Sequence, residues 1–222
     1  MAAIALVAAT WLVKTAFFST QPRVEPDSEL YPVRGIDISA HNGAVDFEKV
    51  KADGYDFVII KASEGTDFKD RNFTDNLRRA REAGLNTGAY HFFRFDTDGM
   101  MQALNLMHSL RFHNLSFPAV IDIEEWGNPD VIATRDIISN LRNMITTLEA
   151  NGIDIILYSN KDGYDRFIKG NFDNYPLWIS SFSEPDPDIN WSIWQYSHSG
   201  KVDGTESKVD LNAIKPEFYR LL

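Results

Sequence analysis

From Arg34 onward, short apolar runs alternate with amphipathic segments along the rest of this 222-residue chain. The apolar runs have the length of strands, and the segments between them repeat their apolar residues with helical spacing. The clearest helical stripe runs through 131–150 and ends at Asn151-Gly152, a typical helix stop. Strands that alternate with helices predict a parallel α/β fold, because each crossover helix packs back on the sheet.

The pattern predicts eight strands, at 34–38, 56–61, 87–92, 118–123, 153–158, 176–180, 191–196 and 208–211. It predicts helices near 46–53, 72–83, 100–113, 131–150, 161–169 and 215–221. Eight strands in about 190 residues favour a closed TIM-like (β/α) barrel. The last three strands leave little room for helices between them. We therefore expect an irregular α/β barrel, with about five β/α units followed by mostly β-strands.

The N-terminal segment, residues 1–22, is apolar and carries one charged side chain, Lys14. This is typical of a signal peptide or a membrane anchor, although the apolar run is shorter than the ~20 residues that span a bilayer. A buried N-terminal helix is the alternative. Residues 23–33 are predicted to be a linker, and residues 34–222 the catalytic barrel. We expect export to the periplasm, the cell envelope or the medium, with or without membrane attachment through residues 1–22.

Charge and residue usage exclude several classes of function. The formal net charge is −10 and no basic cluster is present, so we expect no binding to nucleic acid. Cysteine is absent, which excludes disulfides and thiolate chemistry, and the five histidines lack the spacing of a zinc site. We expect a monomer with no cofactor and no metal.

The stretch Phe117–Trp126, FPAVIDIEEW, is apolar and then acidic, as in a buried strand that exits into a polar cleft. Residues two apart on a strand share a face, so Asp122 and Glu124 point the same way, with Cα atoms roughly 6.5–7 Å apart. Two carboxyls so close in a cleft cannot both ionise easily, and one becomes a general acid with a raised pKa. The alternative is an ordinary strand end that leads into a solvated loop.

Polar residues also follow the other predicted strands, and in a parallel barrel the strand exits meet at one mouth. Asp37 and Asp210 end strands that are neighbours in a closed barrel, so they would join Asp122 and Glu124. The candidate substrate-binding residues at the same exits are Tyr90, His91, Trp126, Tyr158, Trp178, Trp194, Gln195 and Tyr196. Acids ringed by aromatic side chains suit a carbohydrate, whose apolar faces stack on rings. The alternatives are that a single tryptophan belongs to the core, and that His91 is a satisfied histidine of the barrel wall.

At these residues the sequence resembles glycoside hydrolase family 25, the Chalaropsis-type lysozymes or N-acetylmuramidases. The resemblance covers about Arg34 to Leu222. Its motifs include 35–39 (GIDIS), 57–65 (FVIIKASEG), 88–92 (GAYHF), 122–124 (DIE), 178–179 (WI), 194–196 (WQY) and 209–212 (VDLN).

The resemblance implies an irregular barrel and hydrolysis of the β-1,4 bond from N-acetylmuramic acid to N-acetylglucosamine in the glycan strands of peptidoglycan. Glu124 matches the family's catalytic acid, with Asp122, Asp37 and Asp210 as the other active-site acids. Either a carboxylate attacks the sugar directly or the substrate's own N-acetyl oxygen does, and the D-x-E spacing favours the second route. Asn42 and Phe47 depart from common family residues, which affects substrate detail more than activity.

Two other functions remain open at this point. A peptidoglycan-binding barrel with weak or no turnover would lack one of the four acids, and none is missing. A chitinase-like hydrolase of N-acetylhexosaminides would carry a longer acidic run, whereas Ala119-Val120-Ile121 precede Asp122.

Overall fold

The computed structural model describes residues 24–222, and its strands close into a barrel of the expected class. Going round, the order is β1-β2-β4-β5-β6-β7-β8-β9, and β9 pairs back with β1. A short extra strand, β3, pairs only with the end of β2. The strands are β1 (Arg34–Ile38), β2 (Phe57–Glu64), β3 (Phe68–Lys69), β4 (Asn86–Phe92), β5 (Ala119–Asp122), β6 (Ile155–Asn160), β7 (Leu177–Ser180), β8 (Ile193–Gly200) and β9 (Val209–Ile214).

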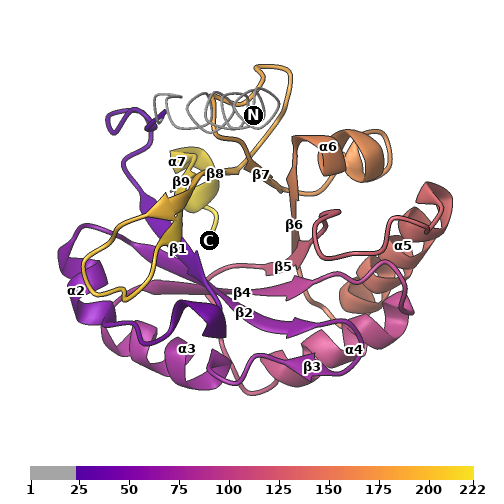
Figure 1. Cartoon of the computed structure of the whole chain (residues 1–222), viewed down its shortest axis with the longest axis horizontal. Helices are drawn as coiled ribbons and strands as arrows, with labels where there is room; N and C mark the ends of the chain where they lie inside the picture. Colours follow the sequence, from indigo (N-terminus) through magenta and orange to yellow (C-terminus); the bar gives the residue numbers. More distant parts are fainter. Residues whose placement is uncertain (1–23) are drawn as a thin grey trace, which may run out of the picture.

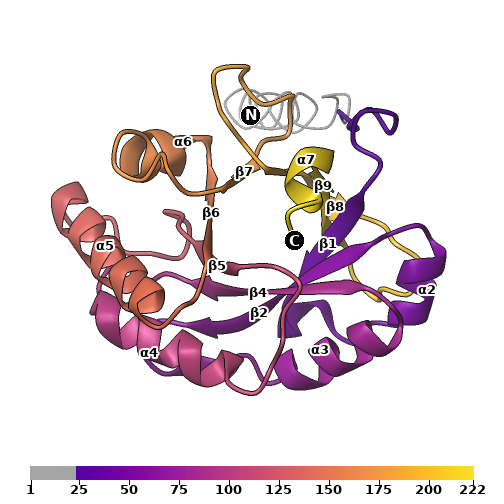
Figure 2. The ribbon, with the colours of Figure 1, turned by 180° about the vertical axis from the view of Figure 1, so that it is seen from behind.

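The main helices, α2 to α5, follow the first four barrel strands, and short helical turns follow the fifth. Figures 1 and 2 show α2 to α5 in an arc along one side of the barrel, whereas the strands from β7 to β9 are joined largely by loops. The predicted helix at 161–169 is instead a short α-helical turn followed by a π-helical one. The helices are η1 (Ala40–Asn42), α2 (Phe47–Ala52), α3 (Phe73–Glu82), α4 (Gly99–Leu110), α5 (Thr134–Ala150), α6 (Lys161–Gly163), η2 (Tyr164–Ile168) and α7 (Pro216–Tyr219).

The direction of the last strand differs from the expected parallel arrangement. Strand β9 runs antiparallel to both of its neighbours, β8 and β1. Asp210 therefore lies near the start of its strand, not at its exit, and that start is at the mouth. The register places Asp210 directly opposite Asp37 of β1. Asp210 thus lies at the predicted mouth because it begins an antiparallel strand, not because it ends a parallel one.

Alternation of side chains divides the core into two parts. One apolar cluster fills the barrel interior, with contributions from Phe57, Ile156 and Ile193, and a larger one lies between the barrel and the helices. Helix α7 packs Phe218 and Tyr219 against the interior cluster. The barrel interior is therefore apolar over much of its depth, below the polar residues at the mouth.

The described part of the predicted linker is in contact with the barrel. The ring of Tyr31 lies 5.3 Å from that of Trp191, and the Val33 carbonyl accepts a hydrogen bond from the Ile214 amide. The predicted export segment, residues 1–22, lies outside the described residues. Within 24–222, no helix has both the length and the apolar character needed to cross a membrane.

The close contact between α4 and α5 yields a test of the fold. A Cβ added at Gly99 would lie 1.8 Å from the backbone oxygen of Asn140, which cannot move without shifting α5. We expect Gly99→Ala to lower the free energy of unfolding by about 1–3 kcal/mol through overpacking. Intrinsic helix propensity predicts the opposite sign, since alanine favours a helix over glycine. Chemical denaturation, with the half-exposed Met100→Ala as control, would reject the packing argument if Gly99→Ala were neutral or stabilising.

Candidate active site

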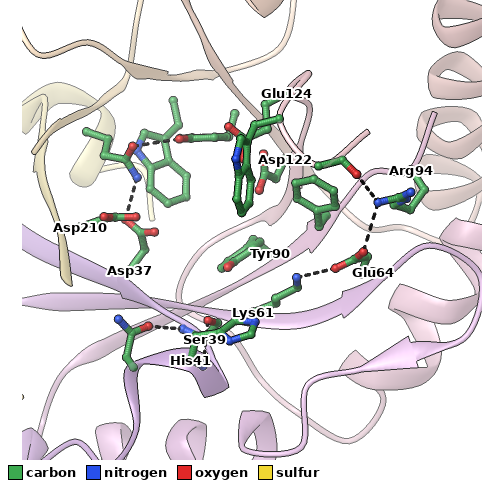
Figure 3. Close-up of a pocket in the computed structure, with 17 residues that line it drawn as sticks. Asp37, Ser39, His41, Lys61, Glu64, Tyr90, Arg94, Asp122, Glu124 and Asp210 are labelled. Carbon is green, nitrogen blue, oxygen red and sulfur yellow. Dashed lines mark hydrogen bonds and ion pairs between the residues drawn. The ribbon is translucent and has the colours of Figure 1, made fainter. Parts of the chain in front are cut away.

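A pocket of about 540 Å³ opens at the mouth of the barrel and gathers most of the predicted site residues. Figure 3 shows Asp37 and Asp210 at one side of it, Glu64 and Arg94 at the other, and Tyr90 between them. All four predicted acids line this pocket. The lining residues are Asp37, Ser39, His41, Asn42, Lys61, Glu64, Tyr90, Phe92, Arg94, Asp122, Glu124, Trp126, Gly127, Tyr158, Trp178, Gln195 and Asp210.

Asp37 and Asp210 form a carboxyl pair across the seam between β1 and β9. The Asp37 Oδ2 accepts hydrogen bonds from Gln195 Nε2 at 3.1 Å and from Asn212 Nδ2 at 2.8 Å. Burial and the neighbouring Asp210 charge raise the pKa of Asp37 well above its usual range, although the two amide donors oppose this. Burial also raises the pKa of Asp210 to about 6. Two carboxyls this close and this buried retain a proton at mildly acidic pH.

Asp122 and Glu124 form a second coupled pair. Burial, followed by the charge of Glu124, raises the pKa of Asp122 well above its usual range. Burial raises the pKa of Glu124 to about 7; the charge of Asp37 adds to this rise and Lys61 opposes it. The Asp122 Oδ1 is buried and has no hydrogen-bond partner among the described residues. A buried carboxylate oxygen without a donor is costly, so this atom is suited to an N–H or O–H from a bound molecule.

The backbone around Glu124 is held by two side chains, one from β6 and one from the loop after β5. Ser159 Oγ donates to the Ile123 carbonyl at 2.6 Å, and Asn128 Nδ2 donates to the Glu124 carbonyl at 2.9 Å. Asn128 also bonds to the loop after β4, through the Phe93 carbonyl and the Phe95 amide. The carboxyl of Glu124 is therefore placed by a fixed backbone, although it lies beyond the end of β5.

Glu125, the next residue, is directed away from the pocket. Its carboxylate accepts a hydrogen bond from Arg166, whose Nε in turn donates to Thr134 Oγ1. The predicted facing of the D-x-E stretch is thus what the structure has: Asp122 and Glu124 line the pocket and Glu125 does not.

Two cations stand opposite the acids. Lys61 Nζ lies 2.7 Å from Glu64 Oε2, and its side chain is only 12% exposed. Arg94 Nη1 lies 3.7 Å from the other oxygen of Glu64 and donates to the Gly127 carbonyl. This chain of charges keeps Lys61 near the acids, where it favours their ionised forms. Among residues 24–222, no three His, Asp or Glu side chains form a group suited to a metal ion.

Aromatic rings and amides form the floor of the pocket. Tyr158 donates to Gln195 Oε1 at 2.9 Å, and Trp178 Nε1 donates to Asn212 Oδ1 at 2.9 Å. These bonds fix the two amides that hold Asp37. Trp126 differs from the buried rings because it is 79% exposed at the rim. An exposed indole beside buried carboxyls is an arrangement that binds a sugar by stacking.

Three predicted binding residues do not line this pocket: His91, Trp194 and Tyr196. His91 is buried on the outer side of β4, between Ser63 Oγ at 2.8 Å and Gln102 Oε1 at 3.1 Å, and burial lowers its pKa to about 4. Trp194 and Tyr196 belong to the apolar cluster between barrel and helices. Their inward neighbours, Tyr90 and Gln195, occupy the pocket face, so strand alternation turns all three outward.

Several residues that line the pocket or hold its acids in place were missing from the predicted set. Asn212 lies two positions after Asp210 on the same strand, so alternation predicts that it faces the same side. Lys61 follows the same rule on β2. Arg94 and Asn128 lie in loops, and no periodic pattern indicates where a loop side chain points.

Asp210 gives a stability prediction. Its pKa is about 6 in the folded protein and ~3.9 when unfolded, so the folded state binds more protons between these values. The stability that this protonation contributes is present below pH ~4 and is lost as the pH rises through about 6. Asp210→Asn should therefore raise the melting temperature at pH 8 by about 2–4 °C. This is the shift that ~1 kcal/mol in the free energy of unfolding produces in a domain of this size. The difference should vanish below pH 4; a lower melting temperature at pH 8 would mark Asp210 as a structural carboxylate.

Comparison with known proteins identifies the family of the chain. The model of Glycosyl hydrolases family 25 matches residues 36–205. The Escherichia coli K12 protein YegX is 33% identical over 192 residues, which are 83% of this chain and 70% of YegX. The autolytic lysozyme of Clostridium acetobutylicum is 32% identical over 182 residues, 81% of this chain and 55% of that protein.

A solved structure extends the match to nearly the whole chain. The family 25 glycosyl hydrolase of Bacillus anthracis superimposes with a TM-score of 0.82 and 30% identity, covering 91% of this chain and 98% of that one. Fold and sequence similarity agree, and the chain belongs to glycoside hydrolase family 25 and is a glycoside hydrolase.

Proposed function

We propose that this protein is a muramidase that cleaves the β-1,4 bond between N-acetylmuramic acid and N-acetylglucosamine in peptidoglycan. The observation that carries the proposal is Glu124, a pocket carboxyl whose pKa burial raises to about 7, paired with a buried Asp122 that lacks a donor. A carboxyl with this pKa is protonated at mild pH, as a general acid requires. The similarity to an autolytic lysozyme supports the same chemistry.

Glu124 is the proton donor in this mechanism. As the glycosidic bond breaks, its electron pair goes to the bridging oxygen, and Glu124 transfers its proton to that oxygen. Positive charge then develops at the anomeric carbon. Ionised carboxylates in the pocket stabilise that charge, and their burial strengthens the interaction.

Asp122 positions the internal nucleophile. The N–H of the sugar's N-acetyl group would donate to Asp122 Oδ1, the buried oxygen that has no partner among the described residues. The N-acetyl carbonyl oxygen then attacks the anomeric carbon and forms a cyclic oxazolinium ion. Water opens this ion, with the Glu124 carboxylate accepting the water's proton, which returns the enzyme to its starting state.

Asp37 and Asp210 adjust the charge around the acid. The charge of Asp37 raises the pKa of Glu124, and the amides of Gln195 and Asn212 hold Asp37 in place. Because this pair retains a proton at mildly acidic pH, it contributes less than its full charge there. Tyr90, Tyr158 and Trp126 supply aromatic surface for the sugar rings.

The substrate determines the compartment. Peptidoglycan lies outside the cytoplasmic membrane, so we propose that the protein is exported and acts as a monomer in the cell envelope or outside it. Residues 1–22 would serve as the export signal or as an anchor.

The bond specificity is tested by the fragments released from purified peptidoglycan. We expect mass spectrometry after borohydride reduction to show reduced N-acetylmuramic acid at the new ends. Reduced N-acetylglucosamine ends would replace the muramidase proposal with a glucosaminidase. Absence of release by the folded protein would reject hydrolysis of peptidoglycan altogether.

Glu124 and Glu125 form a matched pair for mutation. Glu124→Gln keeps the shape but removes the transferable proton, so the rate should fall by about 10²–10⁴ while binding to wall fragments is retained. Glu125→Gln makes the same change one residue on and weakens only the contact with Arg166, so its rate should stay close to the parent's. The reverse ranking would show that Glu124 is not the acid.

Lys61 predicts the pH dependence. The proposed acid must be protonated, so kcat/KM should decline as the pH rises through about 7. Lys61 lowers the pKa of Glu124. Its removal also leaves the negative charge of Glu64 less fully neutralised. Lys61→Met should therefore move the alkaline limb to higher pH, whereas the exposed Lys49→Met should leave it in place. A shift to lower pH, or none, would contradict the assignment of this limb to Glu124.

A further inference from the structure

A second cavity, of about 280 Å³, lies on the outer wall of the barrel and is separate from the active-site pocket. We call it the basic cavity, because its rim carries Arg34, Lys201 and Lys208. Its floor includes Tyr196 and Leu211, outward-facing residues of β8 and β9. Asp210 precedes Leu211 on β9 and lines the active-site pocket, whereas Leu211 lines the basic cavity. The two cavities therefore lie on opposite faces of the same strand.

The three cations come from separate segments of the chain. Arg34 begins β1, Lys201 follows β8, and Lys208 precedes β9. Within residues 24–222, no carboxylate lies within 4.0 Å of any of the three, although the exposed Glu25 also lines the cavity. The chain as a whole has a net charge of −10, so a group of unneutralised cations is unusual for this surface.

Arg34 lines the basic cavity with its guanidinium beside an aromatic ring. Its guanidinium carbon lies 5.4 Å from the centre of the Tyr55 ring, and Tyr55 is itself buried. This cation–π contact keeps the guanidinium beside the ring. A guanidinium next to two lysines, with no ion pair among residues 24–222, is a donor set that carboxylates and phosphates bind.

We propose that the basic cavity binds a single oxyanion group, carboxylate or phosphate, of a cell-wall polymer while the active site holds the glycan. The identity of the polymer in this inference rests on the proposed function. The existence of the anion site does not. The cavity is about half as large as the catalytic pocket, which suits one charged group rather than a chain of sugars.

The two sites are close enough to act on one polymer. The carbonyl of Lys208 accepts a hydrogen bond from the side chain of Asn42, which lines the catalytic pocket. A second contact on the same polymer raises the effective concentration of the glycan at the mouth. Exposed cations bind anions weakly and are screened by salt, so this contribution should be modest and should decrease as ionic strength rises.

The anion site is tested first without any wall material. The full chain is titrated with inorganic phosphate at constant ionic strength, and the amide signals of residues 199–209 are followed by NMR. We expect a saturable shift that is lost in the Lys201→Ser/Lys208→Ser double variant. The double variant Arg81→Ser/Lys169→Ser makes the same change in net charge at other exposed positions and should keep the shift. A shift that does not saturate, or that both double variants reduce equally, overturns the site.

The wall polymer is tested by sedimentation with insoluble walls at low salt. We expect the Lys201→Ser/Lys208→Ser variant to bind less tightly by roughly two- to fivefold per lysine, with soluble glycan cleaved at the parent's rate. Walls stripped of phosphate polymers, and walls stripped of stem peptides, are the two further substrates. If removing the phosphate polymers abolishes the difference in binding between the two double variants, the oxyanion is a phosphate. If removing the stem peptides abolishes it, the oxyanion is a carboxylate. Equal binding of the two double variants on every wall overturns the role in wall binding.

The two proposals fail in different ways. If the parent leaves soluble glycan intact, the muramidase proposal is rejected, while the phosphate titration still decides whether the basic cavity is an anion site. If the titration fails and glycan is cleaved, only the inference about the basic cavity is lost.

Discussion

The active site depends on how the barrel closes. Strand β9 enters antiparallel between β8 and β1, and this register places Asp210 opposite Asp37. The same strand supplies Asn212, which with Gln195 of β8 holds the Asp37 carboxylate. Asp37 in turn raises the pKa of Glu124 from across the mouth. A parallel last strand would present its other end to the mouth, and Asp210 and Asn212 would not lie beside Asp37.

Concentrating four carboxyls at one buried mouth makes the folded protein less stable at neutral pH. Burial raises the pKa of each of them, so ionising any one costs more in the folded state than in the unfolded chain. The apolar clusters on both sides of the barrel wall offset this cost. Such a trade of stability for a reactive site is common in enzymes. Here it is localised at one end of the barrel, above an apolar interior.

Much of this arrangement follows from the sequence, because strand alternation alone decides which residues face inward. The shared face of Asp122 and Glu124 was predictable on that ground. The same rule turns His91, Trp194 and Tyr196 away from the pocket once Tyr90 and Gln195 face it. They were predicted to bind substrate because neighbours in the sequence were assigned to the pocket together. The direction of β9 was not predictable, since an isolated strand carries no sign of which way it pairs. Nor was the position of Asn128, whose contacts join two loops through the fold.

In the proposed mechanism, substrate binding itself decides which carboxyl of the coupled pair holds the proton. Asp122 is fixed on β5 and only 7% exposed, whereas Glu124 is less buried and lies beyond the strand end with one more methylene of reach. A substrate N–H that donates to Asp122 favours its ionised form and lowers its pKa. The resulting charge then raises the pKa of Glu124, because like charges in a buried site oppose one another. The acid is therefore most fully protonated when a sugar with an N-acetyl group is in place, and the buried oxygen without a partner connects recognition to catalysis.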